Sequence, residues 1–332
     1  MKTRYDIVAM GNAIMDIIAP VDDAFVETHA MERNSMNLID ADRALTLHRA
    51  AEKTGDLREI AGGSGVNTLV GAAELGLRTG LIAKVADDRT GRALVDGFRQ
   101  AGVDYATPPT QSGTPSARSM IFVTPDGART MNTFLGASVE FDRADVRADM
   151  IRASKTLYLE GYLFDGDEAK AAFVDAAEIA HAAGRTVALS LSDPFCVNRH
   201  LASFQQLVRT QTDLVFANEE ELFALTGTTS VDAGLDAVER PGFAICVTRG
   251  AAGSVISDGA RRYHVKAAPV EQVVDTTGAG DQYAAGVLAG RAFGLGWQDA
   301  GYLGSLAAAE VISHYGARPE TPIHELAVGL GH

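Results

Sequence analysis

The 332-residue chain contains little cysteine, and it has fewer positively than negatively charged residues. Its two cysteines, Cys196 and Cys246, form no CxxC pair, and no Cys/His cluster has the spacing of a zinc site. A disulfide framework and a structural zinc are therefore not expected. The 29 Lys and Arg stand against 43 Asp and Glu, which gives a formal net charge of −14. This balance argues against nucleic-acid binding, which needs clustered basic residues, but it leaves room for an anionic ligand held by local donors.

Long apolar runs are absent too. No stretch reaches the ~18 apolar residues that a membrane span needs, and Asp6 and Asp16 interrupt the apolar residues near the N-terminus. We interpret that stretch as a first strand rather than a signal peptide. The protein is therefore expected to make no membrane contact and to reside in the cytoplasm.

Three widespread motifs are also missing. The chain has no GxxxxGK[ST] run, no complete GxGxxG run and no GxSxG run. These absences argue against a P-loop nucleotide site, a dinucleotide-binding fingerprint and the nucleophile elbow of an α/β-hydrolase.

What the chain does contain, from residue 154 onward, is a regular alternation of strand-like and Ala-rich helix-like segments. The composition is that of a globular protein, with 46% hydrophobic and 22% charged residues. Strands are expected at 156–159, 186–191, 214–217 and 244–248. Helices are expected at 168–182, 218–226, 279–293 and 298–315. This alternation predicts a doubly wound α/β fold in which helices flank a mostly parallel sheet.

The N-terminal part shows a different pattern. Residues 114–138 contain two strand-like runs separated by Pro125-Asp126-Gly127, which has the chemistry of a hairpin turn. Residues 12–40 mix short strand-like runs with turns. Because these pieces do not suit a parallel sheet, we expect one domain over residues 1–332, with a small β lid formed by segments 12–40 and 114–138.

The most informative segment is the Gly-rich run from Asp275 to Asp281, Asp-Thr-Thr-Gly-Ala-Gly-Asp. Gly278, Ala279 and Gly280 allow a tight bend, and the Ala-rich residues that follow favour a helix beginning here. Unpaired N–H groups at a helix start suit phosphate oxygens. A carboxylate at such a place is expected to accept a proton from an attacking hydroxyl. The alternative is that Asp281 only stabilises the helix start.

Two further segments contain candidate acceptor-binding residues. Gly62 and Gly63 precede a helical pattern and permit close approach of a ligand, while Asn67 can bond hydroxyls as donor and as acceptor. Asn12 and Asp16 follow the first strand, and a carboxylate there suits two adjacent hydroxyls. Each segment is also compatible with an ordinary turn.

A third group lies later in the chain. Asn218 and Glu221 have the pattern of a helix N-cap and its first turn. Thr248, Gly250 and Gly253 belong to a strand that leaves into a tight turn, or to a simple hairpin.

Taken together, these segments resemble the PfkB, or ribokinase-like, family of carbohydrate kinases. Gly62-Gly63-x-x-x-Asn67 is similar to the first family signature, and Asp275-Thr-x-Gly-Ala-Gly-Asp281 is similar to the second. Asn218-x-x-Glu221 resembles the family's N-x-x-E element, and Val247–Gly253 resembles its ATP-side turn. The resemblance extends from Gly11 to about Arg318.

The resemblance implies a doubly wound α/β domain with a small β lid, and a kinase that uses ATP with Mg²⁺ and responds to K⁺. It makes Asp281 the general base, in an anion hole built from Gly278, Ala279 and Gly280. The acceptor-binding residues that it implies are Asn12, Asp16, Gly62, Gly63 and Asn67. The ATP-binding residues that it implies are Asn218, Thr248, Gly250 and Gly253. Glu221 is expected to act on Mg²⁺ through water.

Within the family, the run Leu189–Phe195 resembles the N-L-S-x-P-F run of adenosine kinases, although Ser190 stands where the Asn would be. Glu160-Gly-Tyr162 is expected to place Tyr162 against a purine. Apolar residues of the lid suit a flat base. These residues are Ile14, Met36, Met120, Met131 and Phe134. Adenosine is therefore the expected acceptor, although the same residues would also suit the packed core of the lid or a contact between two lids.

Two other functions stay open at this point. One is a ribokinase- or fructokinase-like kinase that phosphorylates a free sugar. The other is a non-catalytic nucleotide or sugar sensor, which would have no need of the Asp281 carboxylate. The expected partners are a small-molecule acceptor and ATP. The edge of a lid sheet can pair with a second copy, so both a monomer and a homodimer remain possible.

Overall fold

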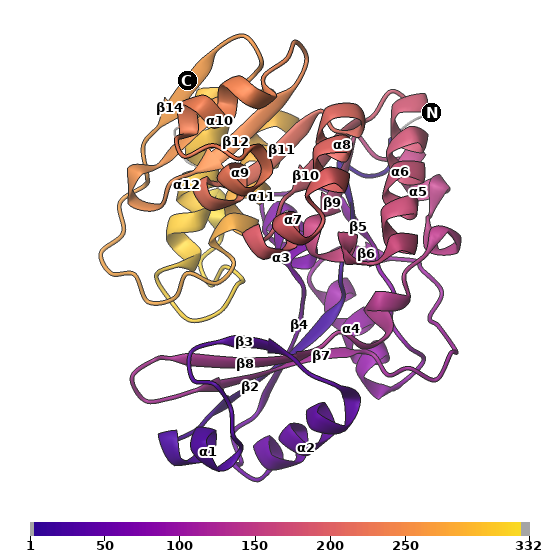
Figure 1. Cartoon of the computed structure of the whole chain (residues 1–332), viewed down its shortest axis with the longest axis vertical. Helices are drawn as coiled ribbons and strands as arrows, with labels where there is room; N and C mark the ends of the chain where they lie inside the picture. Colours follow the sequence, from indigo (N-terminus) through magenta and orange to yellow (C-terminus); the bar gives the residue numbers. More distant parts are fainter. Residues whose placement is uncertain (1–2, 327–332) are drawn as a thin grey trace.

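The computed structural model describes residues 3–326, and this part of the chain forms two β-sheets of unequal size (Figure 1). The larger sheet has nine strands in the described residues, in the order β14-β13-β12-β11-β10-β9-β1-β5-β6. In chain order these strands are β1 (Ile7–Met10), β5 (Thr79–Ile82), β6 (Val103–Tyr105), β9 (Thr156–Glu160), β10 (Thr186–Ser190), β11 (Leu214–Asn218), β12 (Ala244–Thr248), β13 (Ser254–Ser257) and β14 (Arg262–Val265). The pairings from β6 across to β12 are parallel, and β13 and β14 add antiparallel at one edge.

The central strands form because they are short, apolar and buried on both faces. Strand β1 reads Ile-Val-Ala-Met, and all four residues are buried. A parallel sheet needs helices on both faces to achieve this burial. The helices pack into two apolar clusters, one on each face. The first cluster includes α3 (Ser64–Glu74), α4 (Arg89–Gln100), α11 (Ala279–Ala292) and α12 (Trp297–Val311). The second includes α5 (Ala148–Arg152), α6 (Asp167–Ala182), α7 (Pro194–Arg199), α8 (Leu201–Gln211), α9 (Glu219–Thr226) and α10 (Val231–Val238).

The predicted fold class is confirmed, and the expected elements after residue 154 are present with shifts of a few residues. The helix expected at 298–315, for example, spans Trp297–Val311. Residues 79–105 were not assigned by the sequence pattern, and they supply β5, α4 and β6 of the large sheet. Across residues 3–326, no helix is both long and apolar enough to cross a membrane.

The smaller sheet has five strands in the described residues, in the order β3-β8-β7-β2-β4. They are β2 (Ile14–Pro20), β3 (Met36–Leu38), β4 (Arg58–Gly62), β7 (Ala117–Val123) and β8 (Arg129–Phe134). Four of them lie in the two segments expected to form the lid, and β4 comes from outside both. In Figure 1 this sheet lies between the large domain and the helices α1 (Asp23–Thr28) and α2 (Ala41–Glu52).

Strand register decides which side chains of the small sheet face the large domain. Met120 pairs with Ile17, and both are buried in the cluster that includes α2. The neighbouring positions point the opposite way because side chains alternate along a strand. Asp16 therefore lies on the face away from α1 and α2. The prediction that Met120 lines an acceptor slot is wrong, since this side chain fills the core beneath the sheet.

The same register shows on which face of the small sheet the other apolar residues predicted to contact the acceptor lie. Met131 pairs with Met36, on the face that carries Asp16. Ile14 lies two residues before Asp16 and shares this face. Phe134 pairs with Arg118 at the end of β8, on the opposite face.

The strand order indicates where a ligand crevice is expected, at the carboxyl ends of the parallel strands. From β1 the chain order runs outward on one side through β5 and β6, and on the other side through β9 to β12. Ligands of doubly wound sheets bind at such a switch point, outside the carboxyl ends of the strands. Here the switch point lies between β1 and β9, where Gly11, Asn12 and Glu160 are found.

A close backbone contact between α11 and α12 leads to a stability prediction. A Cβ added at Gly286 of α11 would lie 2.6 Å from Gly304 Cα and 2.7 Å from Leu303 O of α12. Ala favours a helix over Gly by about 1 kcal/mol, but overpacking against backbone costs about 1–3 kcal/mol. We therefore expect Gly286→Ala to lower the melting temperature. Gly296→Ala, where no atom lies within 4 Å of the added Cβ, is the control without overpacking; it replaces only the N-cap of α12 and should lower the melting temperature less.

Candidate active site

The Gly-rich loop predicted as an anion site opens α11. Gly278 is the N-cap residue with φ of 79°, a left-handed conformation that favours glycine, and its added Cβ would lie 2.7 Å from Ala317 Cα. No side chain caps this helix start. Within residues 3–326 the amides of Gly280 and Asp281 have no hydrogen-bond acceptor. Free N–H groups at the start of a 14-residue helix provide donors and a partial positive charge for an anion.

Asp281 lies in the first turn of this helix, half-buried. Ser64 Oγ donates to its Oδ1 over 2.6 Å, and Asn67 Nδ2 donates to its Oδ2 over 3.1 Å. Burial raises the pKa of Asp281 to about 7, against the lowering effect of these two hydrogen bonds, and the nearby Glu160 carboxylate adds to the rise. A carboxylate with a pKa near neutrality suits proton transfer at physiological pH.

The two Gly-containing segments predicted from sequence meet at this point. Helix α3 begins at Ser64, directly after Gly63, and packs against α11. The Gln282 side chain donates from Nε2 to Asn67 O over 3.1 Å and to Ala317 O over 3.0 Å. The start of α3, the start of α11 and the C-terminal segment are thereby joined around the Asp281 carboxylate.

Gly62 and Gly63 permit close approaches inside the protein. An added Cβ at Gly63, where φ is 117°, would lie 2.2 Å from Asn12 O. At Gly62 it would lie 2.5 Å from an oxygen of the Asp16 carboxylate. These glycines therefore bring the start of α3 against Asn12 and Asp16, which are predicted to bind the acceptor.

Glu160 is a site residue to which sequence reasoning assigned no role. It ends β9, is 1% exposed, and accepts from Asn12 Nδ2 over 2.9 Å and from Gly65 N over 2.7 Å. Asn12 N donates to it as well, over 3.3 Å. Burial raises the pKa of Glu160, and its three donors lower it. The available sequence signal was a Glu at the end of an otherwise apolar strand, where a buried charge needs partners.

Asp16 occupies the opposite wall, on the small sheet. No donor in the described part of the chain bonds its carboxylate. Burial raises the pKa of Asp16 to about 7, while the positive charges of Arg318 and Arg129 lower it. The carboxylate is thus held near two cations, with its hydrogen-bonding capacity available to a ligand.

Arg129 is a second residue that sequence reasoning missed. It begins β8, and its guanidinium Nη2 lies 2.7 Å from Asp275 Oδ2, while Nη1 donates to Thr277 Oγ1 over 3.2 Å. Asp275 also accepts from Thr277 N over 3.0 Å and from Gly316 N over 2.9 Å. This nearly buried ion pair connects the small sheet directly to the loop that opens α11.

The residues predicted to bind ATP lie at the carboxyl ends of β11 and β12. Asn218 and Thr248 are register partners there. Gly250 is exposed with φ of 55°, and an added Cβ at Gly253 would lie 2.1 Å from Val265 O. These residues are neighbours of one another, and they do not contact Asp281 through any hydrogen bond between described residues.

Glu221 is the residue predicted to act on Mg²⁺, and its surroundings show which kind of contact it can make. It forms a capping box with Asn218, whose N and Nδ2 donate to its two carboxylate oxygens over 3.0 Å and 2.8 Å. Burial raises the pKa of Glu221 to about 7. Within residues 3–326 no group of three or more His, Cys, Asp or Glu side chains is arranged to hold a metal. Mg²⁺ commonly keeps its waters and binds through one carboxylate and the substrate phosphates, so Glu221 fits a water-mediated role only.

Two exposed aromatic residues lie just beyond the carboxyl ends of β9 and β10. Tyr162, in the 3₁₀ turn after β9, is 41% exposed, and Phe195, in the first turn of α7, is 81% exposed. Cys196 Sγ donates to Gly161 O over 3.5 Å, which holds α7 against that turn. Burial and the surrounding carboxylates, Asp281 among them, raise the pKa of the Tyr162 hydroxyl.

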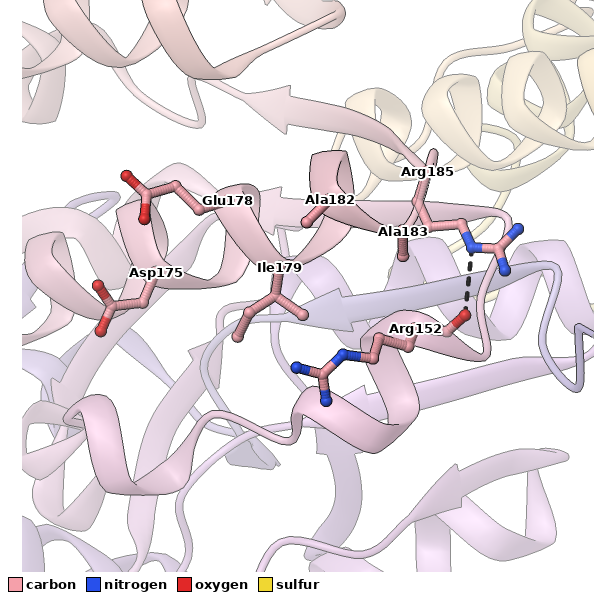
Figure 2. A pocket seen from close by; sticks show the side chains of 7 residues that line it. All are labelled: Arg152, Asp175, Glu178, Ile179, Ala182, Ala183 and Arg185. Atoms are coloured by element: carbon pink, nitrogen blue, oxygen red, sulfur yellow. Dashed lines mark hydrogen bonds between the residues drawn. The ribbon is translucent and has the colours of Figure 1, made fainter. Parts of the chain in front are cut away.

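A hollow of about 590 Å³ is lined by none of these residues, and Figure 2 shows the side chains that line it. It is lined by α5, α6 and the residues just beyond them, including Arg152, Asp175 and Arg185. Arg185 Nε donates to Arg152 O, and Asp175 pairs with Arg143. The hollow contains none of the predicted site residues, and we assign it no part in the site.

Comparison with known proteins agrees with this geometry. The family model described as pfkB family carbohydrate kinase matches residues 32–324. The chain belongs to the PfkB family of carbohydrate kinases. Membership makes this protein an ATP-dependent phosphotransferase that acts on a small-molecule acceptor. The predicted kinase activity and ribokinase-like fold are therefore confirmed.

Similar proteins within the family carry different names. The chain is 45% identical to the adenosine kinase from Sinorhizobium meliloti, with a TM-score of 0.86 and coverage of 98% of this chain and 99% of that chain. It is 42% identical to a probable sugar kinase from Rhizobium etli, with a TM-score of 0.87 and coverage of 98% of both chains. It is 27% identical to a 5-dehydro-2-deoxygluconokinase from Geobacillus thermodenitrificans, over 83% of this chain and 85% of that protein.

The raised pKa of Asp281 leads to a prediction about stability. Its folded-state pKa, about 7, lies above the ordinary value of 3.8, so folding favours the protonated form. The stability that this carboxyl contributes is present at acid pH and is lost as pH rises through about 7. Asp281→Asn should therefore raise the melting temperature relative to wild type at pH 8 and little at pH 4, close to the ordinary pKa of 3.8. Thermal unfolding across this pH range measures the difference.

The exposed Asp56 provides the matched control, because its carboxylate makes no hydrogen bond or ion pair within residues 3–326. Asp56→Asn should follow the wild-type curve at both pH values. A melting temperature of Asp281→Asn that is unchanged or lower at pH 8 would contradict the prediction.

Proposed function

We propose that this kinase phosphorylates the 5′-hydroxyl of a nucleoside, adenosine in particular, with Asp281 as the general base. The observation that supports the base most directly is the Asp281 carboxylate in the first turn of α11, beside free amides and with its pKa raised to about 7. The observation that supports a nucleoside is a set of exposed apolar side chains on the small sheet and just beyond the carboxyl ends of β9 and β10.

In the proposed reaction the acceptor oxygen attacks the γ-phosphorus of ATP. The proton of that hydroxyl passes to the Asp281 carboxylate, the bond from the γ-phosphorus to the bridging oxygen breaks, and ADP leaves. The amides of Gly280 and Asp281, which have no acceptor within residues 3–326, would donate to the oxygens of the transferring group and stabilise its charge. Positioning and electrostatic stabilisation supply most of the catalysis in phosphoryl transfer.

The ribose of the acceptor is proposed to bind between the two walls. Asp16, whose carboxylate has no protein donor in residues 3–326, accepts hydrogen bonds from two adjacent hydroxyls. Asn12, held by Glu160, and Asn67, held against Asp281, present amide groups to the same space. The small sheet acts as the lid, because it carries Asp16 and is joined by Arg129 to the loop of Asp275.

The purine is proposed to lie against apolar side chains. On the lid, Met36 is 52% exposed and Leu38 is 54% exposed, on the face that carries Asp16. On the large domain, Tyr162 and Phe195 are exposed aromatic residues. Large apolar groups that stay exposed in a monomer commonly mark a ligand or partner site, and a flat base can bury its two faces between such groups.

ATP is proposed to lie along the carboxyl ends of β11 and β12, near Asn218, Thr248, Gly250 and Gly253. Glu221 is the carboxylate that would hold a water of the Mg²⁺, and Mg²⁺ supplies positive charge for the phosphate oxygens. The K⁺ effect stays a prediction. In this chain the Arg129 guanidinium already provides a positive charge to Asp275.

A second candidate is a kinase for a sugar acid. Relatives named 5-dehydro-2-deoxygluconokinase match most of the chain. The observation that favours this candidate is the pair of cations near Asp16, Arg129 and Arg318, which would suit a carboxylate on the acceptor. The exposed apolar side chains on both walls favour the nucleoside over this alternative.

The choice of acceptor is tested by steady-state kinetics at fixed MgATP. Burying a purine against apolar side chains contributes about 1–3 kcal/mol beyond ribose binding. The kcat/KM for adenosine should therefore exceed that for ribose, fructose or 5-dehydro-2-deoxygluconate by at least about tenfold. Leu38→Ser should weaken adenosine specifically, whereas Leu45→Ser, at a 43% exposed position of α2 behind the small sheet, serves as the matched control. Equal or better use of a free sugar or sugar acid would remove the adenosine assignment.

The role of the base is tested separately. Asp281→Asn removes the proton acceptor and should lower kcat by about 10²–10⁴. ATP binding, measured by calorimetry, should persist because the backbone amides of the loop remain. A variant that turns over at nearly the wild-type rate would exclude Asp281 from the reaction.

A further inference from the structure

The Ser64 side chain donates a hydrogen bond directly to the proposed base, Asp281. Its hydroxyl donates to Asp281 Oδ1 over 2.6 Å, across 217 residues of sequence. A hydroxyl bound to a carboxylate at this distance is a charge-assisted hydrogen bond, stronger than one between neutral groups. The second donor, Asn67 Nδ2, lies 3.1 Å from Oδ2 and is therefore the weaker contact.

The backbone around Ser64 is held from both sides. Gly63 has φ of 117°, and its neighbour Asn12 lies too close for any side chain at that position. On the other side, Gly65 N donates to the buried Glu160 carboxylate over 2.7 Å. An added Cβ at Gly65 would lie 2.9 Å from the same carboxylate. Ser64 therefore has little freedom, and its hydroxyl reaches Asp281 from a fixed position.

We infer that Ser64 is a positioning residue that orients the Asp281 carboxylate and favours its ionised form, so that the acceptor proton arrives on Oδ2. This inference rests on the proposed function, in which Asp281 is the base. Ser64 binds Oδ1 by the shorter hydrogen bond, and Oδ2, which has only the longer contact, is the oxygen left to receive a proton.

Other charged and titratable groups face the same space. Glu160 at the end of β9 raises the pKa of Asp281. Tyr158 of β9, Tyr162 after β9 and Glu221 of α9 each interact electrostatically with Asp281. On the lid side lie Asp16 of β2, Arg129 of β8 and Arg318. Because Asp16 and Glu221 have pKa values raised to the same range as Asp281, an acid limb in the wild-type profile does not by itself identify Asp281.

A Ser64 substitution does show whether Asp281 causes the acid limb, because among the described residues the Ser64 hydroxyl bonds only Asp281. Ser64→Ala removes a donor to the ionised form, so the pKa of Asp281 rises. The acid limb of the kcat/KM profile should move to higher pH by about one to two units. The rate deficit should be about 10- to 100-fold at pH 6 and should shrink toward pH 9.

Two comparisons separate positioning from a structural effect. Thr68→Val removes a hydroxyl one turn further along α3, which donates to Ser64 O over 3.2 Å and does not touch Asp281. This variant should leave the acid limb where it is in the wild type. Ser64→Thr retains a hydroxyl and should restore much of the wild-type profile.

A double-mutant cycle completes the test. In the Asp281→Asn background, adding Ser64→Ala should change the residual rate by less than about twofold, because the oriented group is gone. A Ser64→Ala profile that falls equally at all pH values, with the acid limb unmoved, would overturn the inference and leave the proposed function intact. Near-wild-type activity of Asp281→Asn alone would instead overturn the proposed base itself.

Discussion

The constraint on which the site depends is the docking of two helix starts around the Asp281 carboxylate. Helix α3 begins at Ser64 and α11 begins at Ala279, and both present their first turns to the same small volume. Asn67 and Gln282 bridge the two helices through side-chain hydrogen bonds to the other helix. Each helix start carries unpaired amides and a partial positive charge, which offsets the burial of negative charge between them.

Several carboxyl groups are buried near this point, although burial disfavours their ionised form. Burial raises the pKa values of Asp16, Glu221 and Asp281 to about 7, and Glu160 is almost fully buried. An ionised group held in such a place costs stability unless hydrogen bonds or opposite charges compensate. A site that accepts this cost is typical of an enzyme, because a base must be ionised and yet basic enough to take a proton.

The compensating cations come from the small sheet and the C-terminal segment rather than from the large domain's strands. Arg129 of β8 pairs with Asp275, and Arg318 approaches Asp16 from the segment after α12. The small sheet therefore contributes charge as well as a wall. Arg129 of this sheet pairs with Asp275 in the loop that opens α11, so that movement of the sheet would change the surroundings of Asp16 and of this loop together.

The fold was largely predictable because its signals are local. Strand and helix alternation after residue 154 predicted the sheet, since apolar runs of five residues and Ala-rich stretches each have a clear preference. The elements in residues 79–105 and the strand β4 were not predicted, because short strands such as Thr-Gly-Leu-Ile at 79–82 show little sequence pattern of their own. Sheet pairing with distant strands stabilises them, and no local window contains that information.

The features of the candidate site likewise divide into those set by local sequence and those set by tertiary contacts. By itself the sequence determined the helix start at Gly278–Asp281, the cap at Asn218 and the family signatures, because turn chemistry and helix propensity act over a few residues. Only the tertiary structure decided that Ser64 contacts Asp281 and that Glu160 holds Asn12, since these partners lie 217 and 148 residues apart.

Register likewise decided that Met131 lies on the face of the small sheet that carries Asp16, while Met120 fills the core, although the two residues have the same side chain. The physical reason is that a shift of one residue along a strand reverses the face that a side chain occupies, and only packing against α2 and pairing with β2 choose between the two faces.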